Sequence, residues 1–429
     1  MSDPSHDPRV LRSWKEIAAK FGVSARTVQS WEADLGLPVH RNPGAKGRVY
    51  AYETELDDWM RSHEGTEAQI PDLPATPRRR SVAAWVAVAV LLAAVGGLAF
   101  WRTRILPPSP IGIRVEKNLL IALGANEGEL WRYRLEAPHT PAPDQVTSGS
   151  DHLIADLNGD GSSEVVCAPS YPSSYPRSSR VLCFSSQGKL LWRFEPGRLV
   201  RTKSGHNYPP PFVTAGVHLV RLGAERGIGI LVLGLNTYFP FQAALLSPDG
   251  RLLREYWHAG HIQKVAIADL DHDGMDEIYL GGISNQAHQA ALVVLRPDRM
   301  AGADLEPESY YQLAGFPSPV EEARIHFARI PGLKDRAQWN QVTVVVPEGS
   351  GLRVHVREPQ TIPVHDLAAI YHFSPDLRLL SVDLSDNYEI VAKLFCSGAV
   401  ISLTAAMEIL RKELTFATPP ANASHLARR

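Results

Sequence analysis

Hydrophobic and polar residues alternate in three different ways along this chain. Between residues 11 and 60, apolar residues recur at the three- and four-residue spacing that predicts amphipathic helices. From residue 82 to 101 the sequence VAAWVAVAVLLAAVGGLAFW contains no charged residue and no proline. After residue 111, short apolar runs alternate with turns rich in glycine and proline, which indicates many short strands. The pattern therefore predicts a small helical unit, one apolar helix and a large β unit.

Residues 82–101 are long enough to cross a membrane as a single helix. At ~1.5 Å per residue, this stretch spans the ~30 Å of a bilayer core. Trp85 and Trp101 lie near its two ends, where indole rings favour the membrane interface. A buried core helix is the alternative, but such a helix is rarely apolar on every face at this length. We therefore expect one transmembrane helix.

The flanking segments suggest an orientation. Residues 64–81 are polar and rich in proline, which predicts a flexible linker. Arg78 to Arg80 favour a cytoplasmic N-terminus, although Arg102 and Arg104 on the other side weaken this bias. We expect a single-pass protein of the inner (plasma) membrane, with residues 1–63 in the cytoplasm and the C-terminal domain periplasmic or extracellular.

The N-terminal segment has clear helix boundaries. Ser13 and Glu16 form a capping box at the start of a helix, and Gly22 is suited to end it. Ser24 can then cap a second helix over residues 25–33. The short turn between these helices is typical of a helix-turn-helix.

The second helix and the segment after it carry residues suited to DNA. The helix exposes polar side chains that can hydrogen-bond phosphates or base edges in a major groove. The glycine-containing residues 44–47, between alternating apolar positions, predict a β-hairpin whose basic residues face the DNA backbone. Residues 53–60 predict a short closing helix. The predicted DNA-contacting residues are Ser24, Arg26, Thr27, Gln29, Ser30, Arg41, Lys46 and Arg48.

The sequence SWKEIAAKFGVSARTVQSWEADLGLPVHR, followed by GRVYAYETELDDWM, resembles the winged helix-turn-helix of the MerR and excisionase group. The resemblance covers residues 11–60 and implies binding of double-stranded DNA through the second helix and the wing. Residues 1–63 hold nine basic and nine acidic residues, so no strong basic field is present. We therefore expect DNA affinity to need a homodimer. The alternative is a small helical domain that binds another protein.

Residues 111–416 contain a degenerate repeat of two strands joined by a turn. The clearest copies begin at Ile121, Val181 and Ala244, and weaker ones begin at Leu292, Tyr371 and Val400. Repeated strand units that cannot bury both faces alone predict an all-β propeller, here of about six blades. The last copy, residues 400–414, also fits an amphipathic helix, but its match to the other copies favours strands. Residues 417–429 are expected to form a disordered tail.

Two loops between these hairpins fit the pattern D-x-[DN]-x-D-G-x-x-E. They are LIADLNGDGSSEVV, from Leu153, and AIADLDHDGMDEIY, from Ala266. Alternating carboxylates in a tight loop can surround a hard divalent cation. An EF-hand would need a glutamate at loop position twelve, where Cys167 and Leu280 stand. The expected ligands are Asp156, Asn158, Asp160, Glu164 and the Ser162 carbonyl, and Asp269, Asp271, Asp273, Glu277 and the Met275 carbonyl.

These loops resemble the calcium loops of FG-GAP (VCBS, integrin α-like) propeller repeats. The resemblance implies two Ca²⁺ sites at blade edges, and we expect a structural role for both ions. The alternative is a pair of acidic surface turns without metal. His258 and His261 have the spacing of zinc ligands but lack a third ligand, so they are better interpreted as core or surface histidines.

Other features exclude several classes of protein. The formal net charge of −2 indicates no particular partner. Three cysteines are too few for a disulfide scaffold, and Cys167 and Cys183 could pair or remain free thiols. Walker, GxSxG and zinc-finger motifs are absent from the sequence, so no enzyme activity is expected.

The whole sequence therefore predicts a multidomain, membrane-anchored, one-component transcription regulator. It would comprise a small α+β winged helix-turn-helix, one transmembrane helix and a propeller that senses a protein or small-molecule ligand. A propeller adhesin or scaffold, whose N-terminal head binds protein, is the alternative. A cell-surface propeller enzyme is the third hypothesis.

Overall fold

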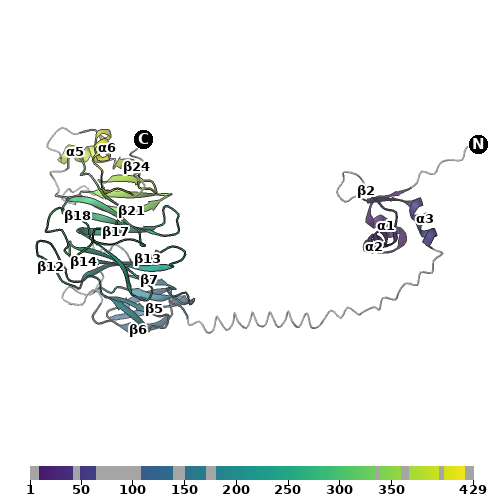
Figure 1. Cartoon of the computed structure of the whole chain (residues 1–429), viewed down its shortest axis with the longest axis horizontal. Helices are drawn as coiled ribbons and strands as arrows, with labels where there is room; N and C mark the ends of the chain where they lie inside the picture. The colour runs from purple at the N-terminus through teal and green to yellow at the C-terminus, as the bar shows by residue number, and fades with distance from the viewer. Residues whose placement is uncertain are drawn as a thin grey trace, which may run out of the picture. The chain divides into compact units, whose positions relative to one another are not determined.

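The computed structural model divides the chain into two compact units, Met1–Gly97 and Leu98–Arg429 (Figure 1). Among the helices described, none is both long and apolar enough to span a bilayer. The predicted linker and the predicted membrane helix, residues 64–81 and 82–101, lie outside the described residues. The structure describes residues 9–41, 49–63, 108–138, 150–170, 180–333, 338–358, 367–395 and 401–420.

Unit 1 combines three helices with a small sheet. Its first two helices begin where the sequence predicts, and the first also ends there. The Ser13 hydroxyl accepts a hydrogen bond from the Glu16 backbone, and Gly22 has a φ of 63°. The second helix extends past residue 33 as far as Leu35, because Gly36 is the next residue able to adopt a positive φ. The elements are α1 (Trp14–Phe21), α2 (Ala25–Leu35), α3 (Glu53–His63), and a sheet ordered β1 (Val10–Leu11), β3 (Val49–Tyr52), β2 (His40–Arg41).

Unit 1 has a hydrophobic core of its own. Ile17, Val28 and Leu56, one from each helix, are fully buried. The rings of Trp31 and Trp59 lie 6.0 Å apart, so α3 packs against α2. Strand β1 was not predicted, because two residues are too short to show a period of two.

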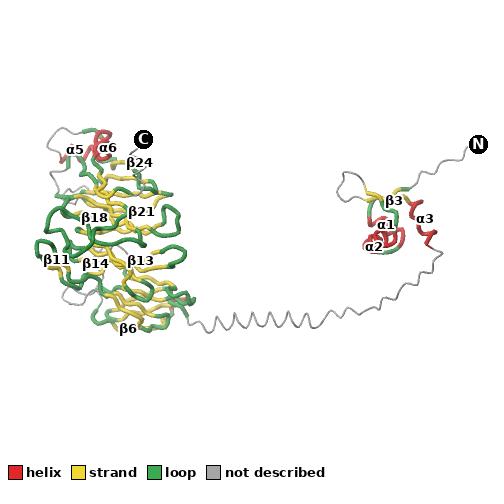
Figure 2. The backbone as a smooth tube through the Cα atoms, viewed as in Figure 1, coloured by secondary structure: helices red, strands yellow, loops and turns green. Residues whose placement is uncertain are grey.

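Unit 2 is mostly β. Within the described residues it contains five antiparallel sheets of three or more strands, in which successive strands pair as in propeller blades. Figure 2 shows that strands make up most of its regular structure. Sheet 1 holds β4 (Gly112–Glu116), β5 (Leu119–Leu123) and β6 (Glu129–Arg134). Sheet 2 holds β7 (His152–Ala155), β8 (Glu164–Cys167), β9 (Val181–Phe184) and β10 (Leu190–Phe194). Sheet 3 holds β13 (Val213–Arg221), β14 (Ile228–Leu235), β15 (Phe241–Leu246) and β16 (Leu252–His258).

Two more sheets follow in the chain. Sheet 4 holds β17 (Gly260–Ala268), β18 (Glu277–Ser284), β19 (Gln289–Leu295), β20 (Ala323–His326) and, at its edge, β25 (Thr415–Thr418). Sheet 5 holds β21 (Gln341–Glu348), β22 (Gly351–Arg357), β23 (Ala369–Phe373) and β24 (Leu379–Leu384). Smaller elements are the 3₁₀ turn η1 (Ala125–Glu127), the hairpin β11 (Val200–Arg201) and β12 (Asn207–Tyr208), and the helices α5 (Tyr388–Phe395) and α6 (Leu403–Lys412).

Four hydrophobic clusters are each shared by two neighbouring sheets of this row, and a fifth packs Trp257 of sheet 3 against residues of connecting segments such as Phe212 and Phe239. Separate clusters join sheets 1 and 2, sheets 2 and 3, sheets 3 and 4, and sheets 4 and 5. No cluster of described residues joins sheet 1 to sheet 5, and Figure 1 places β5 and β24 at opposite ends of the unit. The described sheets thus form an open row of five, not the six blades expected.

Three predictions for the C-terminal third are wrong. Residues 400–414 form helix α6, whose Ala406 and Leu410 are buried one turn apart against the last sheet. The copy from Leu292 supplies β19 alone, because its second half runs on as a loop that reaches β20. The expected disordered tail begins too early, since Thr415–Thr418 pairs with β20.

Candidate functional site

The two acidic loops connect the first and second strands of sheets 2 and 4. We name residues 156–164 loop 1 and residues 269–277 loop 2. Their first aspartates fold both loops in the same way. The Asp156 carboxylate accepts from the Gly161 backbone N–H at 2.8 Å, and the Asp269 carboxylate accepts from Gly274 N–H at 3.0 Å. Both glycines have a φ of 87°, where a side chain would be strained.

The last glutamate of each loop accepts a hydrogen bond from the backbone at the start of the loop. Glu164 Oε2 accepts from the Leu157 backbone N–H at 2.9 Å, and Glu277 Oε2 accepts from Leu270 N–H at 3.1 Å. Both side chains are almost fully buried. Burial raises the pKa of both carboxyls, that of Glu277 to about 7. The sequence motif predicted these glutamates as ligands, and the structure adds their role as acceptors for the loop backbone.

The donor set fits a hard cation. One carboxylate oxygen from each of Asp269, Asp271 and Asp273 lies within 4.8 Å of the others. Loop 1 has the corresponding Asp156 and Asp160, with the amide of Asn158 between them. Carboxylate and amide oxygens are the ligands that calcium prefers, so both loops offer suitable groups.

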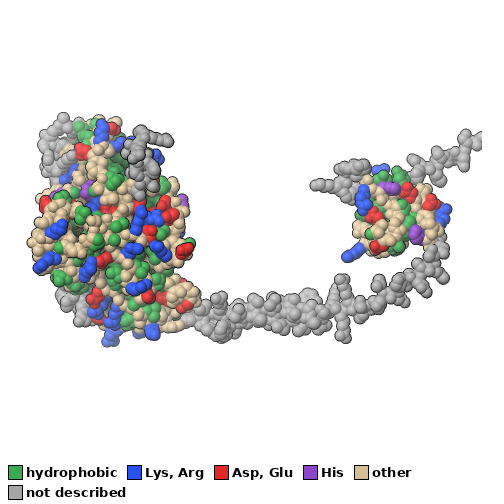
Figure 3. Space-filling model, viewed as in Figure 1, with side chains coloured by type: hydrophobic (Ala, Val, Ile, Leu, Met, Phe, Trp, Pro, Cys, Tyr) green, Lys and Arg blue, Asp and Glu red, His purple; other side chains and the backbone are tan. Residues whose placement is uncertain are grey.

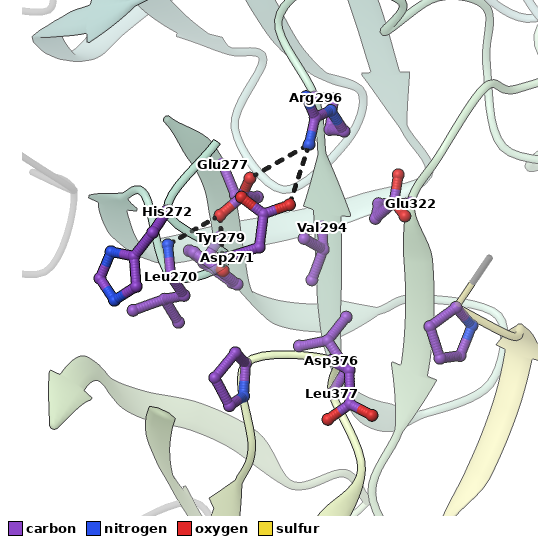
Figure 4. Close-up of a pocket in the computed structure, with 12 residues that line it drawn as sticks. Leu270, Asp271, His272, Glu277, Tyr279, Val294, Arg296, Glu322, Asp376 and Leu377 are labelled. Carbon is purple, nitrogen blue, oxygen red and sulfur yellow. Dashed lines mark hydrogen bonds and ion pairs between the residues drawn. The ribbon is translucent and has the colours of Figure 1, made fainter. Parts of the chain in front are cut away.

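Loop 2 also has a cationic side chain from elsewhere in the protein beside it. Arg296, just beyond the end of β19, reaches across to the loop (Figure 4). Its guanidinium nitrogens lie 2.5 Å from Asp273 Oδ2 and 3.2 Å from Asp271 Oδ2. The hydrogen bond from Arg296 lowers the pKa of Asp273 below its usual range. A calcium ion would have to compete with this guanidinium for the same oxygens.

A second arginine holds the far side of loop 2. Arg221, at the end of β13, donates from its backbone and its guanidinium to the Asp276 carboxylate at 2.7–2.9 Å. Its guanidinium also lies 3.6 Å from Asp269. Arg221 belongs to the segment VRLGAERGIG, which has the strand flanks of an acidic loop but no aspartates. This segment therefore supplies positive charge to loop 2.

Loop 1 differs in its counter-ions. Within the described part of the chain, Asp156, Asp160 and Glu164 make no ion pair with a lysine or arginine. Their partners are backbone N–H groups and the Asn158 amide, which donates to Glu164 at 3.1 Å. Among the described residues, the negative charge of loop 1 is thus balanced by hydrogen bonds alone, whereas loop 2 has two guanidinium groups beside it.

A pocket of about 340 Å³ adjoins loop 2 (Figure 4). Its walls include Asp271 and Glu277 of the loop, Arg296, and the turn at Asp376 and Leu377 between β23 and β24. The pocket therefore lies where sheet 4 meets sheet 5. Any ion that displaced Arg296 from loop 2 would change the charge of this wall.

The predicted DNA-contacting residues of unit 1 divide into two groups. Arg26, Gln29 and Ser30 are exposed on α2, three and four positions apart, so they share one face. Ser24 and Thr27 instead bond each other, with the Ser24 hydroxyl capping α2 and lying 2.8 Å from the Thr27 hydroxyl.

The basic residues predicted for the wing are less free. Both terminal nitrogens of Arg41 donate to Glu32 of α2, at 2.6 and 3.0 Å. Lys46 and Arg48 lie outside the described residues. On the visible face of each unit, acidic and basic side chains are interspersed (Figure 3).

His258 is a core histidine, one of the two interpretations that its sequence context allowed. Its Nδ1 lies 2.8 Å from Asp304 Oδ2, and neither side chain is exposed. Asp304 also accepts from the Ala259 backbone N–H and lies 3.6 Å from Arg324. Sequence reasoning missed this partner because Asp304 lies on a long segment that folds back from β19. Of the two alternatives for Cys167 and Cys183, a disulfide or free thiols, the structure has buried free thiols.

No known family model matches the sequence, and neither does any curated protein. Among solved structures, the chain is similar to the C-terminal domain of Pseudomonas aeruginosa PilY1, with 14% identity and a TM-score of 0.35. That match covers 61% of this chain but only 56% of the PilY1 domain. The Dos1 propeller matches with 10% identity over 66% of this chain and 64% of that one, at a TM-score of 0.30. The V. cholerae biofilm matrix protein Bap1 matches with 11% identity over 64% and 68%, at 0.23. Scores this low carry no argument about function.

Proposed function

We propose that this protein is a membrane-anchored, one-component transcription regulator. In this proposal unit 1 is a winged helix-turn-helix that binds double-stranded DNA in the cytoplasm. Residues 82–101 anchor it in the inner membrane. Unit 2 is a propeller-like ligand-binding domain on the periplasmic or extracellular side.

The observation that carries the proposal is the exposed face of α2. Arg26, Gln29 and Ser30 project from one side of this helix, while Val28 on the opposite side is fully buried. The Ser30 hydroxyl donates to Asp34 of the same helix at 2.7 Å. A capped helix with exposed polar side chains such as Arg26 and Gln29 is the form that enters a major groove. The hairpin of β2 and β3 follows α2 in the sequence, in the place of a wing.

Calcium has a structural role in this proposal. Asp156, Asn158, Asp160 and the Ser162 carbonyl would hold one ion in loop 1. Asp269, Asp271, Asp273 and the Met275 carbonyl would hold the other in loop 2, after Arg296 had moved. Bound calcium would supply positive charge to carboxylates that otherwise repel one another, and it would catalyse no reaction.

DNA binding by the full-length chain in detergent tests the proposal. Bound sequences are first selected from fragmented genomic DNA, and affinity is then measured by fluorescence anisotropy between about 50 and 200 mM salt. Arg26→Gln should weaken binding and lower the salt slope by about one unit if Arg26 contacts a phosphate. Arg61→Gln, which removes an exposed cation from the end of α3, is the matched control and should bind like the parent. The absence of salt-dependent binding in the parent would contradict the proposal.

The second candidate is a membrane-anchored scaffold or adhesin whose unit 1 binds protein. One observation favours it: some of the cations of unit 1, one of them a predicted DNA-contacting residue, already have acidic partners within the unit. Arg41 pairs with Glu32, and Lys20 lies 3.2 Å from Glu53 and 2.6 Å from Asp57. Such a surface attracts polyanions weakly. Failure of every selected DNA fragment to bind, with unit 1 folded by circular dichroism, would support this candidate.

A further inference from the structure

Unit 2 contains a second pocket, of about 460 Å³, which is separate from the acidic loops. We name it the aromatic pocket. Sheet 4 supplies His261 and Gln263 from β17, and sheet 5 supplies Gln341 from the start of β21. Tyr238, from the turn between β14 and β15 of sheet 3, also lines it. Three neighbouring sheets thus build one concave site of the size typical of ligand pockets, about 300–1,000 Å³.

Aromatic rings form much of its wall. Tyr238 is 69% exposed and Trp339 is 37% exposed, although both are large side chains that folding usually buries. Tyr311 is a third ring in the lining. Flat aromatic faces open to solvent in a concave site provide a surface on which the C–H groups of a ring-shaped ligand can stack.

The polar groups of the pocket are neutral and suited to hydrogen bonding. Asn285, Gln263 and Gln341 each bring a side-chain amide, which has both donors and an acceptor. Among the described residues, the amides of Gln263 and Gln341 have no hydrogen-bond partner. The Asn285 amide donates to the Tyr238 carbonyl at 3.1 Å, which fixes its orientation.

The basic side chains among the described lining residues of the pocket are two histidines, His261 and His288. None of its described lining residues is an aspartate, glutamate, lysine or arginine. His261 is 7% exposed, and its Nδ1 is buried without a hydrogen-bond partner in the described structure. Burial lowers the pKa of His261, so the imidazole is neutral at neutral pH. A charged ligand would therefore lose its hydration and find no aspartate, glutamate, lysine or arginine among the described lining residues to pair with.

We infer that the aromatic pocket binds a neutral saccharide. A sugar ring combines an apolar C–H face, which matches Tyr238 and Trp339, with hydroxyl groups that match the amides of Gln263 and Gln341. A purely apolar ligand would leave those amides unpaired, which lowers its affinity. This inference deepens the ligand-binding part of the proposed function by naming the ligand class, and it does not depend on DNA binding.

The test is a glycan array probed with the full-length chain, kept in a detergent that has no sugar headgroup. Neutral oligosaccharides of glucose, galactose, mannose and N-acetylglucosamine are printed beside glycans that carry uronic or sialic acids. The expected result is binding to at least one neutral glycan and weaker binding to its acidic counterparts. The affinity for the best glycan is then measured by titration calorimetry.

Substitutions in the aromatic pocket test whether the glycan binds there. Trp339→Ala and Tyr238→Ala should each weaken binding about tenfold, the order expected for loss of one aromatic face. Phe416→Ala is the matched control, because Phe416 is a 36% exposed aromatic on β25, at the opposite edge of sheet 4, and it should bind like the parent. Thermal melts check folding, and Tyr238→Ala preserves the test if Trp339→Ala unfolds.

Three results would overturn the inference. They are no binding to any neutral glycan, a preference for acidic glycans, and equal affinity of Tyr238→Ala and the parent. DNA binding is measured on the same preparation. Loss of glycan binding with intact DNA binding rejects the saccharide site alone, whereas the reverse result rejects the proposed DNA-binding function alone.

Discussion

The Arg296 guanidinium lies 2.5 Å from the Asp273 carboxylate, so loop 2 holds an internal counter-ion. The corresponding aspartate of loop 1, Asp160, has no such partner within the described structure. The two loops are therefore alike in sequence and backbone hydrogen bonding but different in electrostatics. Because close carboxylates repel one another unless a cation lies between them, loop 1 should depend more on calcium than loop 2.

Unequal calcium dependence of the two loops is the first prediction. Calcium should raise the melting temperature of the full-length chain, and Asp160→Asn should remove most of that rise. Asp273→Asn should remove a smaller part, because Arg296 already screens loop 2. One site at about one hundred times its Kd contributes ~2.7 kcal/mol. Thermal melts in calcium and in chelator measure both effects.

Two outcomes of these melts would contradict the prediction. A melting temperature that is the same in calcium and in chelator would reject the metal sites. A larger loss from Asp273→Asn than from Asp160→Asn would show that Arg296 does not protect loop 2. Asp383→Asn, at a largely exposed carboxylate on β24, is the control and should leave the calcium effect unchanged.

Removing the internal cation is the second prediction. Arg296→Gln should lower the melting temperature in chelator, since Asp271 and Asp273 lose their ion pairs. In calcium the ion can occupy the loop without competition, so the difference between calcium and chelator should exceed that of the parent. Arg299→Gln is a nearby control, because Arg299 pairs with Glu322 outside the loop. An unchanged difference in Arg296→Gln would mean that the guanidinium and calcium do not compete.

The buried pair of His258 and Asp304 gives the third prediction. Asp304→Asn should destabilise unit 2 by about 3–5 kcal/mol, because it leaves neighbouring charged and polar groups buried with a weaker partner. The groups affected are His258, Arg324 and the Ala259 N–H. Chemical denaturation followed by tryptophan fluorescence measures the loss. The exposed Asp383→Asn should change stability by no more than about 0.5 kcal/mol.

The fourth prediction concerns acid stability. Burial, with a contribution from Arg324, lowers the pKa of His326 to about 4, against ~6.5 in an unfolded chain. Between these values the unfolded state binds the proton, so this stability contribution is present above pH 6.5 and is lost as the pH falls towards 4. The full contribution is on the order of 3 kcal/mol. His326→Gln should therefore reduce the loss of stability over this range.

The comparison with the parent is necessary because protonation of Glu277 changes the stability of the fold with pH in the opposite direction. Its pKa is raised to about 7, so the folded state binds its proton more readily than the unfolded state between about pH 4.5 and 7. The difference between parent and His326→Gln isolates the histidine. His206→Gln, at an exposed histidine, should follow the parent, and identical pH profiles for all three proteins would contradict the prediction.

Sequence reasoning succeeded where structure is decided locally. Ser13 and Gly22 mark the ends of α1 by their own chemistry, and the acidic loops follow from side chains a few positions apart. It failed where distant segments meet. Nothing local to β19 shows that Arg296 reaches Asp273, and Asp304 meets His258 only after a long loop has folded back. For residues 400–414, similarity to hairpins misled the prediction, whereas packing of Ala406 and Leu410 favoured a helix.

The open row of sheets has a mechanical consequence. A closed ring shares a load around its circumference, but sheets joined only to their neighbours carry tension in series, so the weakest joint yields first. Among the described residues, the cluster between sheets 1 and 2 contains the fewest buried residues of the four clusters that join neighbouring sheets. Sheet 1 is also the part of unit 2 that follows residues 82–101 in the chain. A pulling force transmitted along the chain from that side therefore acts first on the weakest interface, the one between sheets 1 and 2.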